Sequence, residues 1–109
     1  MNTYGPNIDD PQYYPRLQQL IGPEVDYPLL WLGDFNCILD GDRDRHPPKL
    51  GTKPRMTAAL RTLMQNLGLV DIWRYTHLGR LEYTCYAPTH GTYSRLDRIL
   101  LPQDQLAAL

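Results

Sequence analysis

The sequence predicts a layered α/β fold, and three observations support this prediction. A short apolar run spans residues 28–32, an apolar stripe with helical spacing spans residues 56–67, and two β-rich runs follow near the end. Segments with helix and strand character therefore alternate along the chain, which is typical of helices layered on a sheet. The length of 109 residues fits one small domain or a piece of a larger one.

The first part of the chain is predicted to form a strand, a helix and a second strand. Residues 1–4 end a strand before the break at Gly5-Pro6-Asn7. Asp9 or Asp10 is expected to cap a helix with Pro11 in its first turn. The apolar face of this helix is expected to hold Leu17, Leu20 and Ile21. The apolar run 28–32 is predicted to be a strand that is covered on both faces.

The second part is predicted to contain a loop, a long helix and two strands. Residues 40–54 are polar and rich in Pro and Gly, so we expect a loop. A helical stripe follows, formed by Met56, Leu60, Leu63, Met64 and Leu67, with Gly68 ending the helix. Residues 70–75 are expected to form a helical turn, and residues 82–87 and 92–101 two strands joined by a hairpin at 88–91. This order begins inside a sheet and stops after a strand, so we expect truncation at both ends.

Charge is distributed unevenly along the chain. Residues 1–42 hold seven acidic residues against Arg16 alone, whereas residues 43–61 hold six basic residues against Asp44 alone. The basic segment 43–61 could bind phosphates while the acidic segment beside it binds a cation. The alternative is an ordinary solvated loop. Asp40, Asp42 and Asp44 are expected to be solvated, because Arg45 and Gly51 stand where an EF-hand requires glycine and glutamate.

Several classes of protein are disfavoured. Cys37 and Cys85 form no C-x-x-C pair and the three histidines lack metal-ligand spacing, which argues against a zinc site. We expect Cys37 to be a small buried residue, with a Cys/His nucleophile pair as the alternative. The chain has no signal-peptide pattern and no apolar run of about 18 residues, so we expect an intracellular protein without a membrane span.

The strongest local feature for chemistry is Gly33-Asp34-Phe35-Asn36, at the carboxyl end of the predicted buried strand. Functional sites gather at such strand ends in layered α/β proteins. Asp34 could accept a proton from water, and Asn36 could donate a hydrogen bond to a phosphoryl oxygen. In an extended segment these two side chains point to the same side. The alternative is a strand-to-loop turn, in which Gly, Asp and Asn are common.

A second candidate position is Asp97, which lies among the expected packing residues Leu96, Ile99 and Leu101. We expect its carboxylate to be partly buried, and a buried carboxylate needs a partner. Arg95 or Arg98 could be that partner. A histidine from elsewhere is the alternative, because carboxylates orient catalytic imidazoles.

Five short blocks occur along the chain in an order that is known from one superfamily of enzymes. They are Asn2-x-Tyr4-x-Pro6-Asn7, Gly33-Asp34-Phe35-Asn36, Leu69-x-Asp71-x-Trp73-Arg74, Tyr83-Thr84 and Tyr93-Ser94-Arg95-Leu96-Asp97. With these blocks the chain resembles the endonuclease/exonuclease/phosphatase superfamily, and most closely the endonucleases of LINE-type retrotransposons. The resemblance covers residues 2–97. It implies that residues 1–109 form a partial four-layered α/β sandwich of DNase I type, truncated at both ends.

The resemblance also implies a phosphodiesterase that nicks DNA with Mg²⁺ or Mn²⁺ and needs no small-molecule cofactor. By this resemblance, Tyr4 lies near the scissile phosphate and Asp34 orients or deprotonates the attacking water. Asn36 holds a phosphate oxygen, and Asp97 orients a catalytic histidine. If the substrate is genomic DNA, the protein is expected in the nucleus.

The same resemblance implies a DNA-probing hairpin between Ala87 and Tyr93. Thr92, Ser94 and Arg95 are the contacts that it implies. Three further residues are expected to be structural, namely Asp71, Trp73 and Arg74.

The chain departs from the family pattern at both ends. In the family an asparagine and a metal-binding glutamate precede the tyrosine block, and neither Glu24 nor Glu82 matches that glutamate. The family's closing Ser-Asp-His block has no counterpart, because none of the three histidines follows an aspartate. The tyrosine block reads Tyr4-Gly5-Pro6, where Ala or Val is more usual before the proline. We therefore expect about half a site, with no metal ligand assigned in this chain and no activity by itself.

Two other functions remain open on the sequence. One is a non-catalytic module in which the basic loop 43–55 and the hairpin near His90 hold nucleic acid without cutting it. The other keeps the superfamily but changes the substrate to a sugar or lipid phosphate. The blocks at Tyr93–Asp97 and Trp73-Arg74 favour the nucleic-acid branch.

Overall fold

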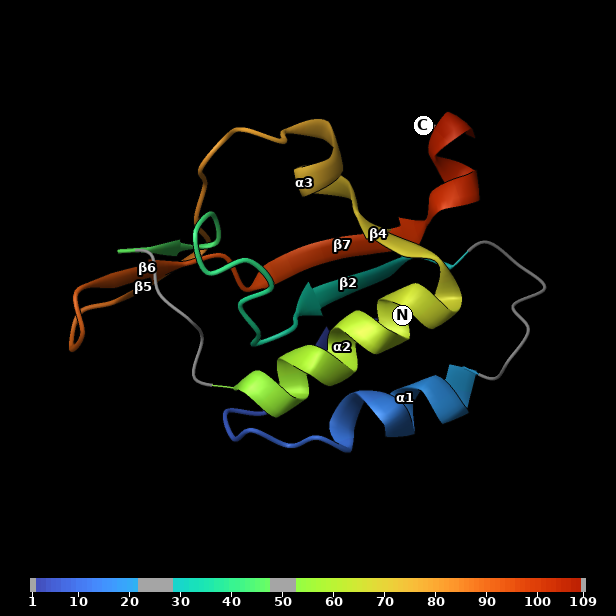
Figure 1. The fold of residues 1–109 in the computed structure, drawn as a ribbon, viewed down its shortest axis with the longest axis horizontal. Helices are drawn as coiled ribbons and strands as arrows, with labels where there is room; N and C mark the ends of the chain where they lie inside the picture. The colour runs from blue at the N-terminus through green and yellow to red at the C-terminus, as the bar shows by residue number, and fades with distance from the viewer. Residues whose placement is uncertain (1, 22–28, 48–52, 109) are drawn as a thin grey trace.

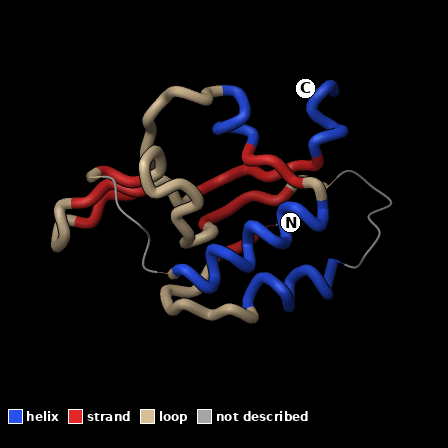
Figure 2. Tube along the Cα trace, viewed as in Figure 1, coloured by secondary structure: helices blue, strands red, loops and turns tan. Residues whose placement is uncertain are grey.

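Two β-sheets organise the chain in the computed structural model, which describes residues 2–21, 29–47 and 53–108 (Figures 1 and 2). A four-stranded sheet has the order β1-β2-β7-β4, and a three-stranded sheet has the order β3-β6-β5. The elements are β1 (Asn2–Tyr4), α1 (Tyr13–Ile21), β2 (Trp31–Asp34), β3 (Arg45–His46), α2 (Pro54–Leu67), β4 (Leu69–Asp71), α3 (Ile72–Thr76), β5 (Cys85–Ala87), β6 (Thr92–Ser94), β7 (Asp97–Pro102) and the 3₁₀ helix η1 (Gln103–Ala108). None of the helices in the described ranges is long and apolar enough to cross a bilayer.

The core lies between the four-stranded sheet and the helices α1 and α2, which Figure 1 shows side by side below β2 and β7. Tyr14, Trp31 and Phe35 are fully buried and contact one another, with ring centroids 5.3–6.2 Å apart. The Tyr14 hydroxyl donates a hydrogen bond to the carbonyl of Phe35. Burial raises the pKa of Tyr14 well above its ordinary value, and the nearby Cys37 adds to this shift, so the hydroxyl remains a donor. Each such buried side chain stabilises the fold by about 1.5–3 kcal/mol.

The other face of this sheet is open. Trp31 and Leu100 are fully buried toward the helices, whereas their neighbours Leu32 and Ile99 are 38% and 45% exposed. The prediction that the apolar run is covered on both faces is therefore wrong for its described residues, and residue 28 lies outside the described ranges. The alternation of exposure is that of a strand with one buried face.

The first helix differs from its prediction at its start and on its apolar face. It begins at Tyr13, because the Asp10 carboxylate accepts a hydrogen bond from the backbone N–H of Gln12 and holds a turn before the helix. Asp9 instead caps α2, since its carboxylate accepts hydrogen bonds from the backbone N–H groups of Arg55 and Met56. Leu20 is 82% exposed, so its expected place on the packed face is also wrong.

The end of α2 and the hairpin confirm their predictions, whereas three other predictions need correction. Gly68 is left-handed at the end of α2, and β5 pairs with β6 across residues 88–91. The predicted loop 40–54 contains the short strand β3, and the predicted turn 70–75 begins as β4 before α3. The single strand predicted over 92–101 is divided between β6 and β7, which belong to different sheets. The division follows from Arg95, whose backbone N–H bonds the carbonyl of Asp44 outside both sheets.

Candidate active site

Three of the predicted catalytic residues lie in one row across the four-stranded sheet. Tyr4 is the register partner of Asp34 in the parallel pair β1–β2, and Asp34 is the register partner of Asp97 in the antiparallel pair β2–β7. Residues directly opposite one another on neighbouring strands project from the same face of a sheet. By strand alternation this is the face of Leu32 and Ile99, which is the open face. The row therefore sits at one end of the open face, accessible to a ligand.

Asn36 is a buried residue whose hydrogen bonds connect Asp34 to the loop after Tyr4. Its backbone N–H donates to Asp34 Oδ1 at 2.8 Å, and its Nδ2 donates to the carbonyl of Gly5 at 3.0 Å and to Asn7 Oδ1 at 2.8 Å. It is 7% exposed and its φ is 55°, in the left-handed region. The argument that Asp34 and Asn36 share a side of one extended segment is therefore wrong. Asn36 instead fastens the loop after β1 to the end of β2.

Two glycines let these segments approach so closely. A Cβ at Gly33 would lie 2.1 Å from the carbonyl oxygen of Thr3. The φ of Gly33 is 139°, a backbone conformation that disfavours any other residue. A Cβ at Gly5 would lie 2.6 Å from the carbonyl oxygen of Phe35. The glycines of both blocks are thus required by the contact between β1 and β2, and this contact aligns Tyr4 with Asp34.

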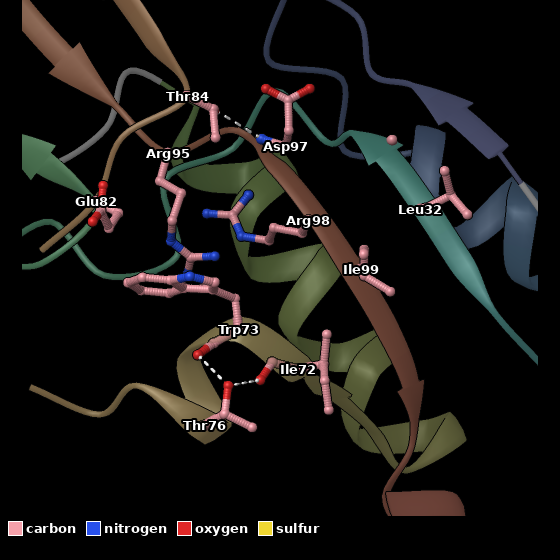
Figure 3. A pocket seen from close by; sticks show the side chains of 11 residues that line it. Leu32, Ile72, Trp73, Thr76, Glu82, Thr84, Arg95, Asp97, Arg98 and Ile99 are labelled. Carbon is pink, nitrogen blue, oxygen red and sulfur yellow. Dashed lines mark hydrogen bonds between the residues drawn. The ribbon is translucent and has the colours of Figure 1, made fainter. Parts of the chain in front are cut away.

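Thr84 fixes the position of Asp97. Its Oγ1 accepts hydrogen bonds from the backbone N–H groups of Leu96 at 3.1 Å and Asp97 at 3.3 Å, and Figure 3 shows the bond from Asp97. The Asp97 side chain is exposed, which corrects the expectation of partial burial. Its exposure follows from the strand alternation, since the neighbouring residues Arg98 and Leu100 are the ones that point inward.

The charges of Arg95 and Arg98 are directed away from Asp97, into a buried ion network around Asp44. The Asp44 carboxylate is 3.4 Å or less from three guanidinium groups, those of Arg74 at 2.8 Å, Arg95 at 2.9 Å and Arg98 at 3.4 Å. Asp71 adds a second carboxylate, 2.6 Å from Arg95 and 3.4 Å from Arg98. Asp44 is 1% exposed, so the expectation that it is solvated is wrong.

This network connects the segment after β2 to α3, β4 and β7. Burial by itself raises the pKa of Asp44, but hydrogen bonds from Arg74 and Arg95 outweigh that effect and hold the pKa below its ordinary value. Asp71 also caps α3 by accepting a hydrogen bond from the backbone N–H of Arg74. The guanidinium carbons of Arg74 and Arg95 lie 5.0 and 5.3 Å from the centre of the Trp73 ring. Asp71, Trp73 and Arg74 thus hold tertiary structure, in agreement with the resemblance.

The residues expected to contact DNA occupy different environments. Thr92 and Ser94 lie on β6 and are partly exposed, whereas Arg95 is 3% exposed and paired with Asp44 and Asp71. This placement does not fit a side chain that contacts DNA. Three arginines of the basic segment are also engaged within the chain, because Arg43 pairs with Asp40, Arg55 pairs with Asp9, and Arg61 donates to the Leu39 carbonyl.

A pocket of about 560 Å³ adjoins the row on the open face (Figure 3). Its apolar walls come from Leu32, Ile72, Trp73 and Ile99, and Asp97 also lines it. An apolar pocket with a few polar groups at one end is a common setting for a ligand site.

The residues of the row supply too few ligands for the Mg²⁺ or Mn²⁺ that the resemblance implies. Mg²⁺ and Mn²⁺ favour about six oxygen ligands in near-octahedral geometry. Asp34 and Asp97 bring two carboxylates to neighbouring register positions, but the described part of the chain contains no group of three or more His, Cys, Asp or Glu side chains that could hold a metal. These residues do not form a metal site by themselves.

The sheet, its helices and the polar row at the strand ends define a layered α/β fold with a candidate site at one end of its open face. A model of the Endonuclease/Exonuclease/phosphatase family matches residues 4–109, and the chain belongs to that family. Among solved structures, it is similar to an AP endonuclease from Archaeoglobus fulgidus, with a TM-score of 0.73 and 26% sequence identity. The match covers 94% of this chain and 48% of that one, so this chain spans about half the length of its structural neighbour. The predicted fold class is confirmed.

Proposed function

We propose that residues 1–109 are part of a metal-dependent phosphodiesterase domain that nicks DNA, of the kind found in LINE-type retrotransposons. The observation that carries this proposal is the register row of Tyr4, Asp34 and Asp97 on the open face. Membership of the family supports phosphodiester chemistry, and the AP endonuclease neighbour supports DNA as the substrate. Action on genomic DNA would require a nuclear location.

In this proposal each residue of the row has a separate task. Asp34 orients or deprotonates the attacking water, and a positioned base of this kind contributes about 10²–10⁴-fold to the rate. Its Oδ1 is held by the backbone N–H of Asn36, which fixes the direction of the carboxylate. Tyr4, which is 73% exposed, stands beside the scissile phosphate. Asp97 orients a histidine that comes from outside this chain.

Asn36 acts in this proposal mainly by positioning Asp34 and the loop after β1. Both of its side-chain N–H groups are engaged, one by the Gly5 carbonyl and one by Asn7. A hydrogen bond to a phosphate oxygen requires one of these two contacts to open. For the DNA-probing hairpin we retain Thr92 and Ser94 as DNA contacts. We propose that Arg95 instead stabilises the start of β7 through its ion pairs with Asp44 and Asp71.

The proposed cofactor is Mg²⁺ or Mn²⁺, in line with the general dependence of this family on divalent metals. When bound, the metal would neutralise negative charge on the phosphate. The side chains that bind this metal would have to come from outside the described residues, because these contain no group of three or more His, Cys, Asp or Glu side chains that could hold it. We therefore propose that the chain is inactive by itself.

A second candidate function is a non-catalytic nucleic-acid-binding remnant. The observation that favours it is the same incomplete set of metal-binding side chains in the described part of the chain. Binding to phosphates would then fall steeply as salt rises.

The test is a supercoiled-plasmid nicking assay with Mg²⁺, with this chain and its Asp34→Ala variant, beside a DNA-binding titration of both in EDTA. We expect both proteins to bind DNA equally and neither to nick it. Nicking by the wild type that is lost in Asp34→Ala would show that this half site suffices, and would overturn the proposed inactivity. Failure of either protein to bind DNA would contradict DNA as the partner.

A further inference from the structure

The three-stranded sheet carries a row of rings on one face that the proposed nicking reaction does not use. His46 on β3 is the register partner of Tyr93 on β6, and Tyr93 is the register partner of Tyr86 on β5. Direct partners across neighbouring strands project from the same face. β6 is the central strand, so Tyr93 lies between the other two rings.

These rings form a continuous aromatic surface together with Tyr83. The ring centroids of Tyr86 and Tyr93 are 4.6 Å apart, and the Tyr83 ring lies 5.9 Å from Tyr93 and 6.4 Å from His46. Cross-strand packing explains why the rings touch one another. It does not bury them, because Tyr86 is 50% exposed, Tyr93 is 45% exposed and His46 is exposed. We call His46, Tyr83, Tyr86 and Tyr93 the ring face.

The strands that carry the ring face contain no negatively charged side chain. The strands β3, β5 and β6 contain Arg45 and His46 and no carboxylate. By strand alternation Arg45 and Ser94 project from the opposite face, where they line a pocket of about 110 Å³ with Lys53 and Asn36. The same small sheet therefore has exposed rings on one side and, on the other, cations beside Asn36 of the candidate active site. Figure 1 shows β5 and β6 extending away from the four-stranded sheet.

Exposed aromatic rings in a row match the chemistry of unpaired nucleobases. Glu82, the carboxylate next to Tyr83 in the sequence, is paired with Arg80. Every base has a π-face, so stacking on tyrosine or histidine tolerates any sequence, while cations nearby attract the phosphates. The bases of an intact duplex are already stacked on each other and cannot lie on such a surface. The ring face is a surface distinct from the hairpin tip at residues 88–91.

We propose that the ring face is a stacking platform for unpaired bases of a DNA strand next to the site of cleavage. This inference rests on the proposed function for its choice of DNA, and it adds that the domain prefers single-stranded or locally opened DNA over closed duplex.

The test is fluorescence anisotropy with a labelled single-stranded oligothymidylate and the corresponding duplex, in EDTA so that cleavage plays no part. The variants are Tyr86→Leu/Tyr93→Leu, which removes the rings, and Tyr86→Phe/Tyr93→Phe, which keeps them. Tyr75→Leu is the matched control, because Tyr75 is 52% exposed on α3, outside the ring face. The single variant Tyr86→Leu on the edge strand serves if the double leucine variant does not fold.

We expect the wild type to bind the single strand more tightly than the duplex. Loss of each ring should weaken single-strand binding by roughly 5- to 150-fold, whereas the phenylalanine variant and Tyr75→Leu keep the wild-type affinity. Single-strand binding that is absent in the wild type, or unchanged in the leucine variants, would overturn the platform. Because this readout needs neither metal nor Asp34, an absence of nicking leaves the platform unaffected. Unchanged single-strand binding by the leucine variants would overturn the platform and leave the nicking proposal unaffected.

Discussion

Asp44 shows how a single residue can join segments that are far apart in the chain. An isolated buried carboxylate is strongly unfavourable, and it persists only if partners compensate for its lost hydration. Here Arg74, Arg95 and Arg98 supply that compensation, and they lie 30, 51 and 54 positions away. The segment that follows β2 is thereby held against β7, next to Asp97.

Removing this charge should destabilise the protein more than any surface substitution nearby. In Asp44→Asn the buried guanidinium groups of Arg95 and Arg98 keep only the carboxylate of Asp71 as counter-charge, so the free energy of unfolding should fall by about 3–5 kcal/mol. Denaturant unfolding followed by circular dichroism measures the difference. Asp42→Asn is the control, since Asp42 is exposed two positions away. Equal stability of the two variants would contradict the role of Asp44.

The same residue should give the protein a specific sensitivity to acid. The pKa of Asp44 in the folded state is lowered from its ordinary value of 3.8 by its arginine partners. A depressed folded-state pKa contributes stability that is present above the unfolded value and is lost as pH falls through the folded value. The stability difference between the wild type and Asp44→Asn should therefore be constant near neutral pH and shrink below about pH 4. A difference that persists undiminished in strong acid would argue against this ion network.

At the level of residues, the sequence blocks pointed to Tyr4, Asp34 and Asp97, which the sheet register aligns in one row, but not to the ion network. Tyr4, Asp34 and Asp97 were identifiable because each sits in a recognisable block at a strand end. Asp44 stands in a segment full of charges, where its solvated neighbour Asp42 looks the same. The burial of Asp44 depends on arginines that only the fold brings close to it. Thr84 was part of a sequence block, but the sequence did not show that it holds the backbone of Asp97.

Among the elements, α2 and α1 differ in how closely the apolar stripe predicts the packed face. In α2 the stripe residues Met56, Leu60 and Leu63 are all buried. In α1 the packing centre is Tyr14, while Leu20 points to solvent. A hydrogen bond from the backbone N–H of Gln12 to the Asp10 carboxylate holds a turn that delays the start of α1. The sequence did not reveal this turn, because Pro11 by itself favours a helix that starts at its own position.

Truncating one leucine in each helix should reveal this difference. Leu60→Ala removes a fully buried side chain and should cost about 2–5 kcal/mol of unfolding free energy. Leu20→Ala should change it by about 0.5 kcal/mol or less, because Leu20 is 82% exposed. Both values come from the same denaturant titration. A large loss in Leu20→Ala would mean that its side chain is covered in solution.

The second half of the chain was harder to predict in detail because its elements are short. Strand β3 has two residues and β4 has three, and both form by pairing with strands far along the chain. The division between β6 and β7 lies at Arg95, whose side chain points into the ion network. No glycine or proline stands at this position, so the sequence gives no sign of the break. Long, periodic elements such as α2 were predictable from the sequence, whereas these pairings were not.

For the whole molecule, the open face of the four-stranded sheet is the main consequence of the architecture. Leu32 and Ile99 lie in the middle of that face, and contiguous exposed apolar surface favours association. Leu32→Thr/Ile99→Thr should therefore bind less of a hydrophobic dye and self-associate less than the wild type, as measured by dye fluorescence and sedimentation. Leu78→Thr is the control, since Leu78 is 67% exposed away from the sheet. Equal dye binding by all three proteins would show that this face is covered.

The central claim of the proposed function is that Asp34 belongs to a phosphodiesterase site that needs further residues besides the described ones of this chain. The most direct measurement uses a chimera in which this chain replaces the matched part of the Archaeoglobus fulgidus AP endonuclease, with metal-dependent DNA cleavage as the readout. We predict that the chimera cleaves and that Asp34→Ala slows it by about 10²–10⁴-fold, while the exposed Asp42→Ala leaves the rate unchanged. A folded chimera that does not cleave, or that cleaves equally well with Asp34→Ala, would contradict the claim.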